Sequence, residues 1–284
     1  MRGCPWASVF LAATFLHARA ATEPLVEVPF QFREGLIWLR VDVPDSAEKL
    51  NFLLDSGASA SVIGLRTAQR LGLRLGKKVC VRGVRTTTSG YWPTRLRAGI
   101  GGVSLPKDSL ALDLQSLSDA CDLAVDGLVG VDFFRDRVVQ VDFAAGKIRL
   151  FKPARATFPG DVLPLRIRPC GMCLPVSVNG APAQWLRLDT GCAAALQWVS
   201  PAARDEKGER RIAVGLDTVF IPQATTRLRI GPRDFDAVPT GVHRREIFAG
   251  ESGLLGTGIL ARFSLVTIDM TAGRVVLGEV VPAN

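Results

Sequence analysis

Residues 52–57, FLLDSG, and residues 186–191, LRLDTG, share one pattern: a largely apolar run, an aspartate, a hydroxyl residue and a glycine. The apolar run carries the carboxylate into a dry environment, and the glycine lets the backbone turn sharply and leaves room beside the aspartate. The hydroxyl of Ser56 or Thr190 can hold the turn through hydrogen bonds. One such segment is a weak signal because aspartate starts many turns. Two copies in one chain predict a pair of carboxylates that act together.

These two segments belong to an internal repeat. GLVG at 127–130 matches GLLG at 253–256, and VVQVDFAAGKIRL at 138–150 matches LVTIDMTAGRVVL at 265–277. Each of the longer segments has the pattern of a β-hairpin, with two short strands around a turn that ends in glycine. The matches occur in the same order as the aspartate segments and at nearly constant spacing. This arrangement indicates a duplicated unit.

Each repeat is predicted to fold as a β-rich lobe, the first over residues 24–155 and the second over residues 160–282. The linker, Lys152–Gly160, carries two prolines and ends in glycine. A hairpin is expected before each aspartate, with strands at 36–43 and 50–54 in the first lobe and at 172–178 and 183–188, around Asn179-Gly180, in the second. We also expect a helix at Leu65–Leu71, ended by Gly72, and a charged loop at Arg204–Arg211.

Composition supports a folded, β-rich chain and limits which residue types could act as catalytic groups or metal ligands. Hydrophobic residues make up 48% of the 284 residues, which excludes a disordered chain, and 28 glycines and 17 prolines indicate short strands and tight turns. The two histidines, His17 and His243, are too few for a histidine-cluster metal site. Since His243 precedes a charged run at 244–246, we expect it on an exposed loop. Carboxylates are therefore the groups expected to carry the chemistry.

The N-terminus has the pattern of a secretory signal peptide, residues 1–20. Arg2 is followed by an apolar stretch at 4–16 and by small residues at Ala18-Arg19-Ala20 that suit cleavage before Ala21. The alternative is an uncleaved anchor. We expect cleavage and a periplasmic or secreted protein without stable membrane insertion, because the apolar stretch is short for a membrane span.

Positive charge is concentrated in the first repeat. The chain has a formal net charge of +8, and Ser56–Lys107 carries ten bases and no acid. One interpretation is a solvated face, and the other is attraction of an acidic substrate or an anionic envelope surface. We predict no nucleic-acid partner, since Tyr91 and Trp92 are the only aromatic residues in this stretch.

Cysteine offers no clear metal or redox motif. An odd number remains after signal cleavage, so at least one thiol is unpaired within the chain. The remaining cysteines are Cys80, Cys121, Cys170, Cys173 and Cys192. Cys170 and Cys173 form a C-x-x-C, but they precede a predicted strand rather than a helix, and no second C-x-x-C completes a zinc site.

Taken together, FLLDSGAS and LRLDTGC, with DGLVGVDFF and SGLLGTGIL downstream, resemble the aspartic peptidases. The duplication resembles pepsin-like enzymes, and the Asp-Ser-Gly-Ala motif resembles retropepsin-like bacterial members. The resemblance implies an all-β bilobal fold in which Asp55 and Asp189 face each other and activate a water molecule. It also implies a polypeptide substrate, no metal or organic cofactor, and a monomer with an internal pseudo-two-fold. Support of the catalytic loops is expected from Ser56, Gly57, Thr190 and Gly191.

The same resemblance implies a hairpin, called a flap, over the site. We expect it from Val81 to Leu96, with Tyr91 or, in its place, Trp92 against the substrate. The other interpretation of Tyr91 is an ordinary edge-strand aromatic. The tripeptides 128–130 and 254–256 are expected to pack beneath the two aspartate loops.

The sequence departs from the pepsin pattern three residues after each aspartate. Pepsin-like enzymes usually carry serine or threonine there, whereas this chain has Ala58 and Cys192. Cys192 is either a small buried side chain or a disulfide partner of Cys170 or Cys173. The loss of hydroxyl donors predicts a mildly acidic optimum rather than a strongly acidic one.

The alternative function is a non-catalytic, pepsin-like protein that binds peptides or envelope polymers, and a third possibility is another hydrolase. Retention of both aspartates favours the peptidase. We expect their carboxyl oxygens to approach within about 3 Å, and cleavage of a denatured protein, abolished by Asp55→Asn, separates these functions.

Overall fold

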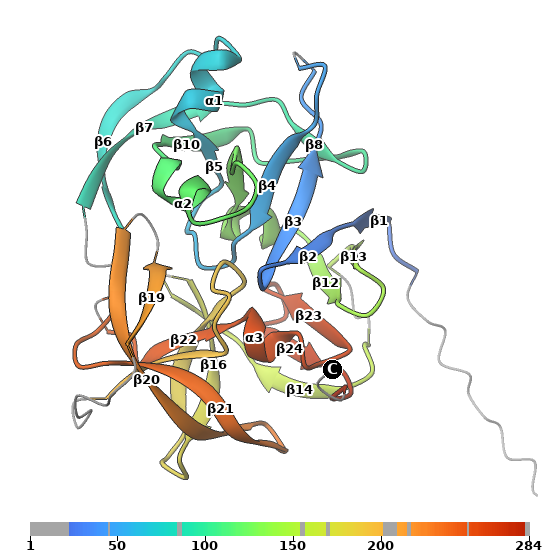
Figure 1. Ribbon diagram of the computed structural model, residues 1–284. Coiled ribbons are helices and arrows are strands. Elements are labelled where there is room, and N and C mark those ends of the chain that lie inside the picture. The colour runs from blue at the N-terminus through green and yellow to red at the C-terminus, as the bar shows by residue number, and fades with distance from the viewer. Residues whose placement is uncertain are drawn as a thin grey trace, which may run out of the picture.

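The computed structural model describes residues 23–44, 46–83, 87–153, 157–168, 171–200, 209–214, 217–248 and 250–281. The predicted signal peptide and Cys170 lie outside these residues. The described chain is mostly β-structure, as predicted, and is arranged in several sheets (Figure 1).

The first large sheet comes from the first repeat. Within the described residues it has eight strands, in the order β2 (Gln31–Arg33), β3 (Leu36–Val41), β4 (Leu50–Leu54), β11 (Gly127–Val129), β5 (Val62–Gly64), β10 (Asp108–Leu112), β7 (Thr87–Arg95) and β6 (Lys77–Arg82). The short strands β8 (Gly99–Ile100) and β9 (Val103–Ser104) pair separately, and α2 (Gln115–Asp119) precedes β11.

The second large sheet repeats this order with strands of the second repeat. Its eight described strands are β15 (Arg166–Arg168), β16 (Gly171–Val178), β17 (Gln184–Asp189), β22 (Gly253–Gly256), β18 (Leu196–Val199), β21 (Arg233–His243), β20 (Asp217–Ile230) and β19 (Glu209–Val214). In both sheets the strand that leads to the aspartate pairs in parallel with the G-x-x-G strand, β4 with β11 and β17 with β22. The duplication seen in the sequence is therefore a duplication of sheet topology.

A third sheet joins the two repeats. Among the described residues it has six strands, in the order β1 (Val26–Pro29), β13 (Lys147–Phe151), β12 (Val138–Asp142), β23 (Leu265–Asp269), β24 (Arg274–Leu277) and β14 (Asp161–Pro164). The central strands β12 and β23 are the two copies of the predicted hairpin segment, and Gln140 pairs with its own repeat equivalent, Thr267. Gln140 Nε2 donates to Thr267 Oγ1 at 2.8 Å. The pseudo-two-fold axis therefore passes beside this pair.

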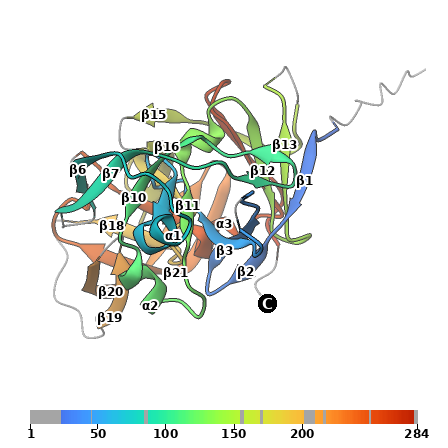
Figure 2. The ribbon, with the colours of Figure 1, turned by 90° about the horizontal axis from the view of Figure 1, so that it is seen from above.

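Figures 1 and 2 place β1, β12 and β13 on one side of the molecule and the β6–β7 hairpin on the opposite side, where the β19–β20 hairpin of the second repeat also lies.

Most local predictions are confirmed. Helix α1 spans Leu65–Arg70, and Gly72 follows it with a left-handed backbone, φ 65°. The hairpin around Asn179-Gly180 forms as β16 and β17. The predicted charged loop at Arg204–Arg211 is wrong over its last three residues, since β19 begins at Glu209 and pairs with β20. Residues 204–208 lie outside the described chain.

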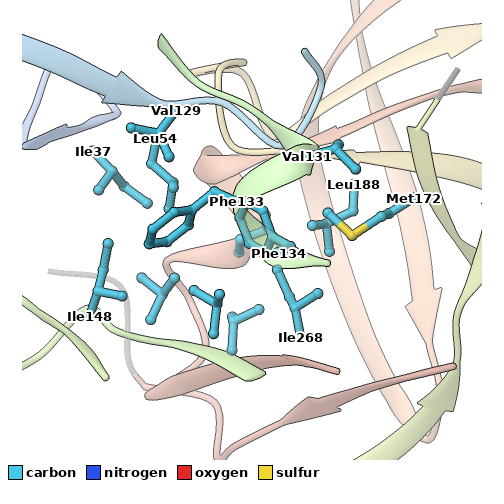
Figure 3. Close-up of a cluster of buried hydrophobic side chains, with 14 of the residues drawn as sticks. Ile37, Leu54, Val129, Val131, Phe133, Phe134, Ile148, Met172, Leu188 and Ile268 are labelled. Atoms are coloured by element: carbon cyan, nitrogen blue, oxygen red, sulfur yellow. The ribbon is translucent and has the colours of Figure 1, made fainter. Parts of the chain in front are cut away.

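A shared core lies under both aspartate strands (Figure 3). Leu54 and Leu188, which precede the two aspartates, are fully buried. Phe133 and Phe134 of the 3-10 helix η1 (Val131–Phe134) lie between the layers, above Ile268 of the third sheet. Burying one such aromatic side chain contributes roughly 1.5–3 kcal/mol. This continuous core holds the ends of β4 and β17 in a defined relative position.

None of the helices in the described part of the chain has the length and apolar content needed to cross a membrane.

Candidate active site

The structure brings Asp55 and Asp189 together at the junction of the repeats. Asp55 directly follows β4, and its backbone N–H donates to Val129 O of the neighbouring β11 at 2.9 Å. Asp189 ends β17 and is paired with Gly256. Both strands end at the same junction, where each carboxyl group lies against the glycine of the opposite repeat's aspartate loop.

Gly57 and Gly191 allow this approach. A methyl group on Gly57 would lie 2.5 Å from Asp189 Oδ1, and a methyl group on Gly191 would lie 2.5 Å from Asp55 Oδ1. Each glycine of one repeat therefore lies directly against the carboxylate of the other. Any larger side chain at either position would push the carboxyl groups apart.

Ser56 and Thr190 lock the two loops with four reciprocal hydrogen bonds. Ser56 Oγ donates to Leu188 O at 2.8 Å and accepts from Thr190 N at 3.0 Å. Thr190 Oγ1 donates to Leu54 O at 2.8 Å and accepts from Ser56 N at 2.9 Å. Both hydroxyl side chains are buried, so these bonds are shielded from competing water.

The strand pairs behind the loops supply further support. Gly130 directly follows β11, and Gly256 is the last residue of β22. A methyl group at either glycine would lie 2.4 Å or less from the backbone of the adjacent aspartate loop. The tripeptides 128–130 and 254–256 therefore pack against these loops. Val131 N donates to Ala58 O at 2.9 Å, and Thr257 N donates to Cys192 O at 2.8 Å in the equivalent place. Thr257 begins α3 (Thr257–Leu260), the counterpart of η1.

Burial governs the ionisation of the pair. Desolvation raises the pKa of Asp55, while hydrogen bonds from the Gly57 and Ala58 N–H groups, at 2.9 and 3.1 Å, lower it. Desolvation and then the charge of Asp55 raise the pKa of Asp189 to about 7, opposed by Arg187 and by a 3.0 Å hydrogen bond from Gly191 N. Two carboxyl groups this close cannot both ionise easily, so the pair retains a proton well above the usual range of an aspartate.

Arg187 is a functional candidate that the sequence analysis missed. Its side chain is 4% exposed and forms an ion pair with Glu251, whose side chain is 1% exposed. Arg187 Nη1 also donates to Gly57 O, in the loop of the other repeat, at 2.9 Å. The available signal was an arginine in an otherwise apolar strand that ends in a catalytic-type aspartate, where the first repeat has Leu53.

Cys192 carries a free thiol and is half-buried, so the disulfide alternative is wrong and a small packed side chain remains. Burial first, and the nearby charge of Asp189 second, raise the pKa of this thiol to about 12. The thiol is therefore neutral. Cys80 and Cys121 are free thiols as well, and Cys173 is buried in β16.

The predicted flap begins earlier than expected. It is formed by β6 from Lys77 and by β7, which ends at Arg95. Tyr91 is half-buried, lies between Lys78 and Ala111 of the neighbouring strands and packs on the main core, while Trp92 is 37% exposed. Contact of either aromatic ring with a substrate stays a prediction.

His243 is buried, and its predicted place on an exposed loop is wrong. The side chain is 3% exposed, because β21 continues to His243 and pairs it with Val199 on β18. His243 Nε2 lies 2.7 Å from Gln197 Oε1. The charged run that follows it suggested a loop, but strand pairing from a distant segment determined the outcome.

The bases predicted to cluster in the first repeat are exposed wherever the structure describes them, and Arg85 lies outside those residues. Arg70 pairs with Asp126 at 2.9 Å, and Arg95 approaches Asp108 at 3.7 Å. Over the described chain, no group of three or more histidine, cysteine, aspartate or glutamate residues is placed to hold a metal ion.

Comparison with known proteins finds a match around the first of the two aspartates. Residues 39–133 match the family described as aspartyl protease. The match contains Asp55 and the β6–β7 hairpin but stops before Asp189. The search of curated proteins returned no match.

Proposed function

We propose that this chain is an aspartic endopeptidase that hydrolyses peptide bonds through Asp55 and Asp189. The observation that carries the proposal is the close approach of the two carboxyl groups, which come from different repeats, each lie against the glycine of the opposite repeat, and follow loops locked by the reciprocal bonds of Ser56 and Thr190. Two half-buried carboxyl groups that hold one proton between them suit general acid–base hydrolysis. The aspartyl protease match over residues 39–133 agrees with this chemistry.

The mechanism needs one charged and one protonated carboxyl group. The charged group removes a proton from a bound water molecule while the water oxygen attacks the carbonyl carbon of the peptide. The protonated group gives its proton to the carbonyl oxygen, which yields a neutral tetrahedral intermediate. Collapse of this intermediate breaks the C–N bond: the protonated carboxyl group gives its proton to the leaving nitrogen, and the other carboxylate takes a proton from a hydroxyl of the intermediate, so the pair again holds one proton. The chain's own residues supply every proton transfer.

Cleavage of a denatured protein tests the proposal. We expect wild type to cut it and both Asp55→Asn and Asp189→Asn to lose activity by at least about 1,000-fold, since each removes a group that transfers a proton. Asp122→Asn is the matched control, because the Asp122 side chain is 66% exposed and pairs with Arg33 on the surface. A wild-type protein that binds the denatured chain without cutting it would favour the binding function instead.

We also propose that the substrate is a polypeptide, that the enzyme is active as a monomer because both aspartates are in one chain, and that it works in the periplasm or outside the cell. Localisation is supported by the signal-peptide pattern of residues 1–20. N-terminal sequencing of the protein from separated cell fractions tests this part. The expected mature chain begins at Ala21 and is absent from the cytoplasmic fraction.

A further inference from the structure

Arg187 reaches from the second repeat into the aspartate loop of the first. Its Nε donates to Glu251 Oε1 at 2.9 Å, Nη2 contacts the same oxygen, and its guanidinium carbon lies 4.3 Å from the centre of the Phe248 ring. Gly171, with φ 146°, lies beside the stem of Arg187, and a methyl group there would be 3.4 Å from its Cγ. These contacts fix the guanidinium and direct Nη1 to Gly57 O at 2.9 Å.

The Gly57 carbonyl belongs to the same peptide unit as the Ala58 N–H, which donates to Asp55 Oδ1 at 3.1 Å. A positive donor on the carbonyl oxygen polarises the peptide and strengthens its N–H as a donor. Arg187 therefore acts on Asp55 through one peptide group. The counterpart of Arg187 in the first repeat cannot act on Asp189 in the same way, because it is Leu53, which has no polar atom in its side chain.

We infer that Arg187 is a positioning residue which, through the Gly57–Ala58 peptide, makes Asp55 the charged member of the pair and leaves the shared proton on Asp189. The distribution of charge is a property of the folded protein. Its consequence for catalysis, that Asp55 is the base and Asp189 the acid, rests on the proposed function.

The groups around the pair agree with this assignment. Desolvation raises the pKa of both aspartates, and the charge of Arg187 opposes this rise in both. Asp55 accepts two backbone N–H groups, from Gly57 and Ala58, which favour its charged form. Glu251 faces Arg187 and partly offsets its charge. The Cys192 thiol, in the loop after β17, is neutral because burial raises its pKa to about 12.

The two repeats supply the test variant. Glu251 lies two residues before its G-x-x-G strand, and the residue at the same place in the first repeat is Val125, which packs in one apolar cluster with Leu53. Arg187→Leu alone would leave a buried carboxylate without its partner. The double variant Arg187→Leu/Glu251→Val installs the apolar pair of the first repeat and leaves the net charge unchanged. The control, Arg229→Gln/Asp234→Asn, removes an exposed ion pair of the second repeat.

Carbon-13 NMR titration of the aspartate carboxyl groups in the full protein measures the charge directly, with Asp55→Asn and Asp189→Asn used for assignment. In wild type we expect Asp55 to ionise at lower pH than Asp189. In the double variant the Asp55 midpoint should rise by about half a pH unit or more, so that the two midpoints approach each other. The inference is overturned if Asp189 ionises first in wild type, or if the Asp55 midpoint moves no further than in the control.

Glu251→Gln keeps the test decisive if the double variant does not fold. It removes the charge that offsets Arg187, so the Asp55 midpoint should fall rather than rise; a rise or no shift contradicts the inference. Where peptide cleavage is measurable, the acid side of the kcat/KM profile should move with the Asp55 midpoint. A protein that cleaves nothing but shows these titration shifts refutes the proposed function and supports the role of Arg187.

Discussion

Equivalent positions behind the two aspartates hold different chemistry. In the first repeat, Leu53 and Val125 pack in an apolar cluster, whereas in the second repeat Arg187 and Glu251 form a buried ion pair. A buried ion pair offers little net stability over a well-packed apolar pair of similar size. The contrast shows that the site departs from two-fold symmetry in its electrostatics, although an apolar pair fits the equivalent position of the same fold.

In a second contrast, the first repeat carries the polar side chains and the second repeat does not. Ser61 in the first repeat donates to Asp132 Oδ1 at 2.7 Å and accepts from Gly130 N at 3.1 Å. The corresponding residues of the second repeat are Ala195 and Gly258, and a methyl group at Gly258 would lie 2.7 Å from Ala195 N. One repeat thus braces its aspartate loop with polar side chains and the other by close backbone packing. What the repeats share, the aspartate, hydroxyl and glycine, is what forms the junction itself.

The largest expected effect tests the shared part of the junction. Gly57→Ala and Gly191→Ala should each reduce kcat/KM by on the order of 100-fold or more, since each new methyl group would displace the carboxylate of the opposite repeat. Steady-state cleavage of one peptide by both variants measures this. Gly72→Ala, at a surface site with open space, is the control for activity. A large loss in one variant and none in the other would break the symmetry drawn here.

The pH dependence of stability should distinguish the half-buried aspartate pair from exposed carboxylates. The folded-state pKa of Asp189 is raised from 3.8 to about 7, so the folded state binds a proton that the unfolded chain releases. Stability is therefore highest below the unfolded value and falls as pH rises from about 4 to about 7, by roughly 1–3 kcal/mol once partial exposure of the residue is allowed for.

Asp189→Asn should lose most of this pH dependence and gain stability relative to wild type at pH 8. Urea unfolding at several pH values measures the change, with Asp122→Asn as the exposed control. If wild type and Asp189→Asn lose stability in parallel over this interval, the pair is not protonated as described.

A smaller effect compares the third residue after each aspartate. Ala58→Ser and Cys192→Ser each introduce a hydroxyl donor beside a catalytic carboxyl group, which favours its ionised form. Both pH–kcat/KM profiles should move toward acid by less than about one pH unit. An optimum of wild type in strong acid that neither substitution moves would show that other groups set the ionisation of the pair.

The smallest effect concerns charge outside the site. Exposed bases are concentrated in the first repeat, between Ser56 and Lys107. If they steer substrate, kcat/KM for an acidic peptide should fall several-fold between low and high salt, while a neutral peptide of equal length changes little. Equal salt responses of the two peptides would support the interpretation of a solvated face.

Short-range sequence patterns were sufficient to predict the aspartate segments, helix α1, the Asn179-Gly180 hairpin and the duplicated hairpins β12–β13 and β23–β24. Each depends on neighbours within a few residues: an apolar run, a turn residue or a helix stop. The nearly constant spacing of the matches indicated the duplication, and the duplication predicted two β-rich lobes. These features were readable because hydrophobic periodicity and turn chemistry are properties of contiguous residues.

Features that depend on contacts between distant residues could be identified only from the tertiary structure. The burial of His243 follows from pairing with β18, and the third sheet follows from pairing of Gln140 with Thr267 across 127 positions. Arg187 is the clearest case, since its partners Gly57 and Glu251 lie 130 and 64 positions away. The residues next to an arginine in a strand do not indicate which groups it will contact, because its ion pairs and hydrogen bonds depend on distances that only folding establishes.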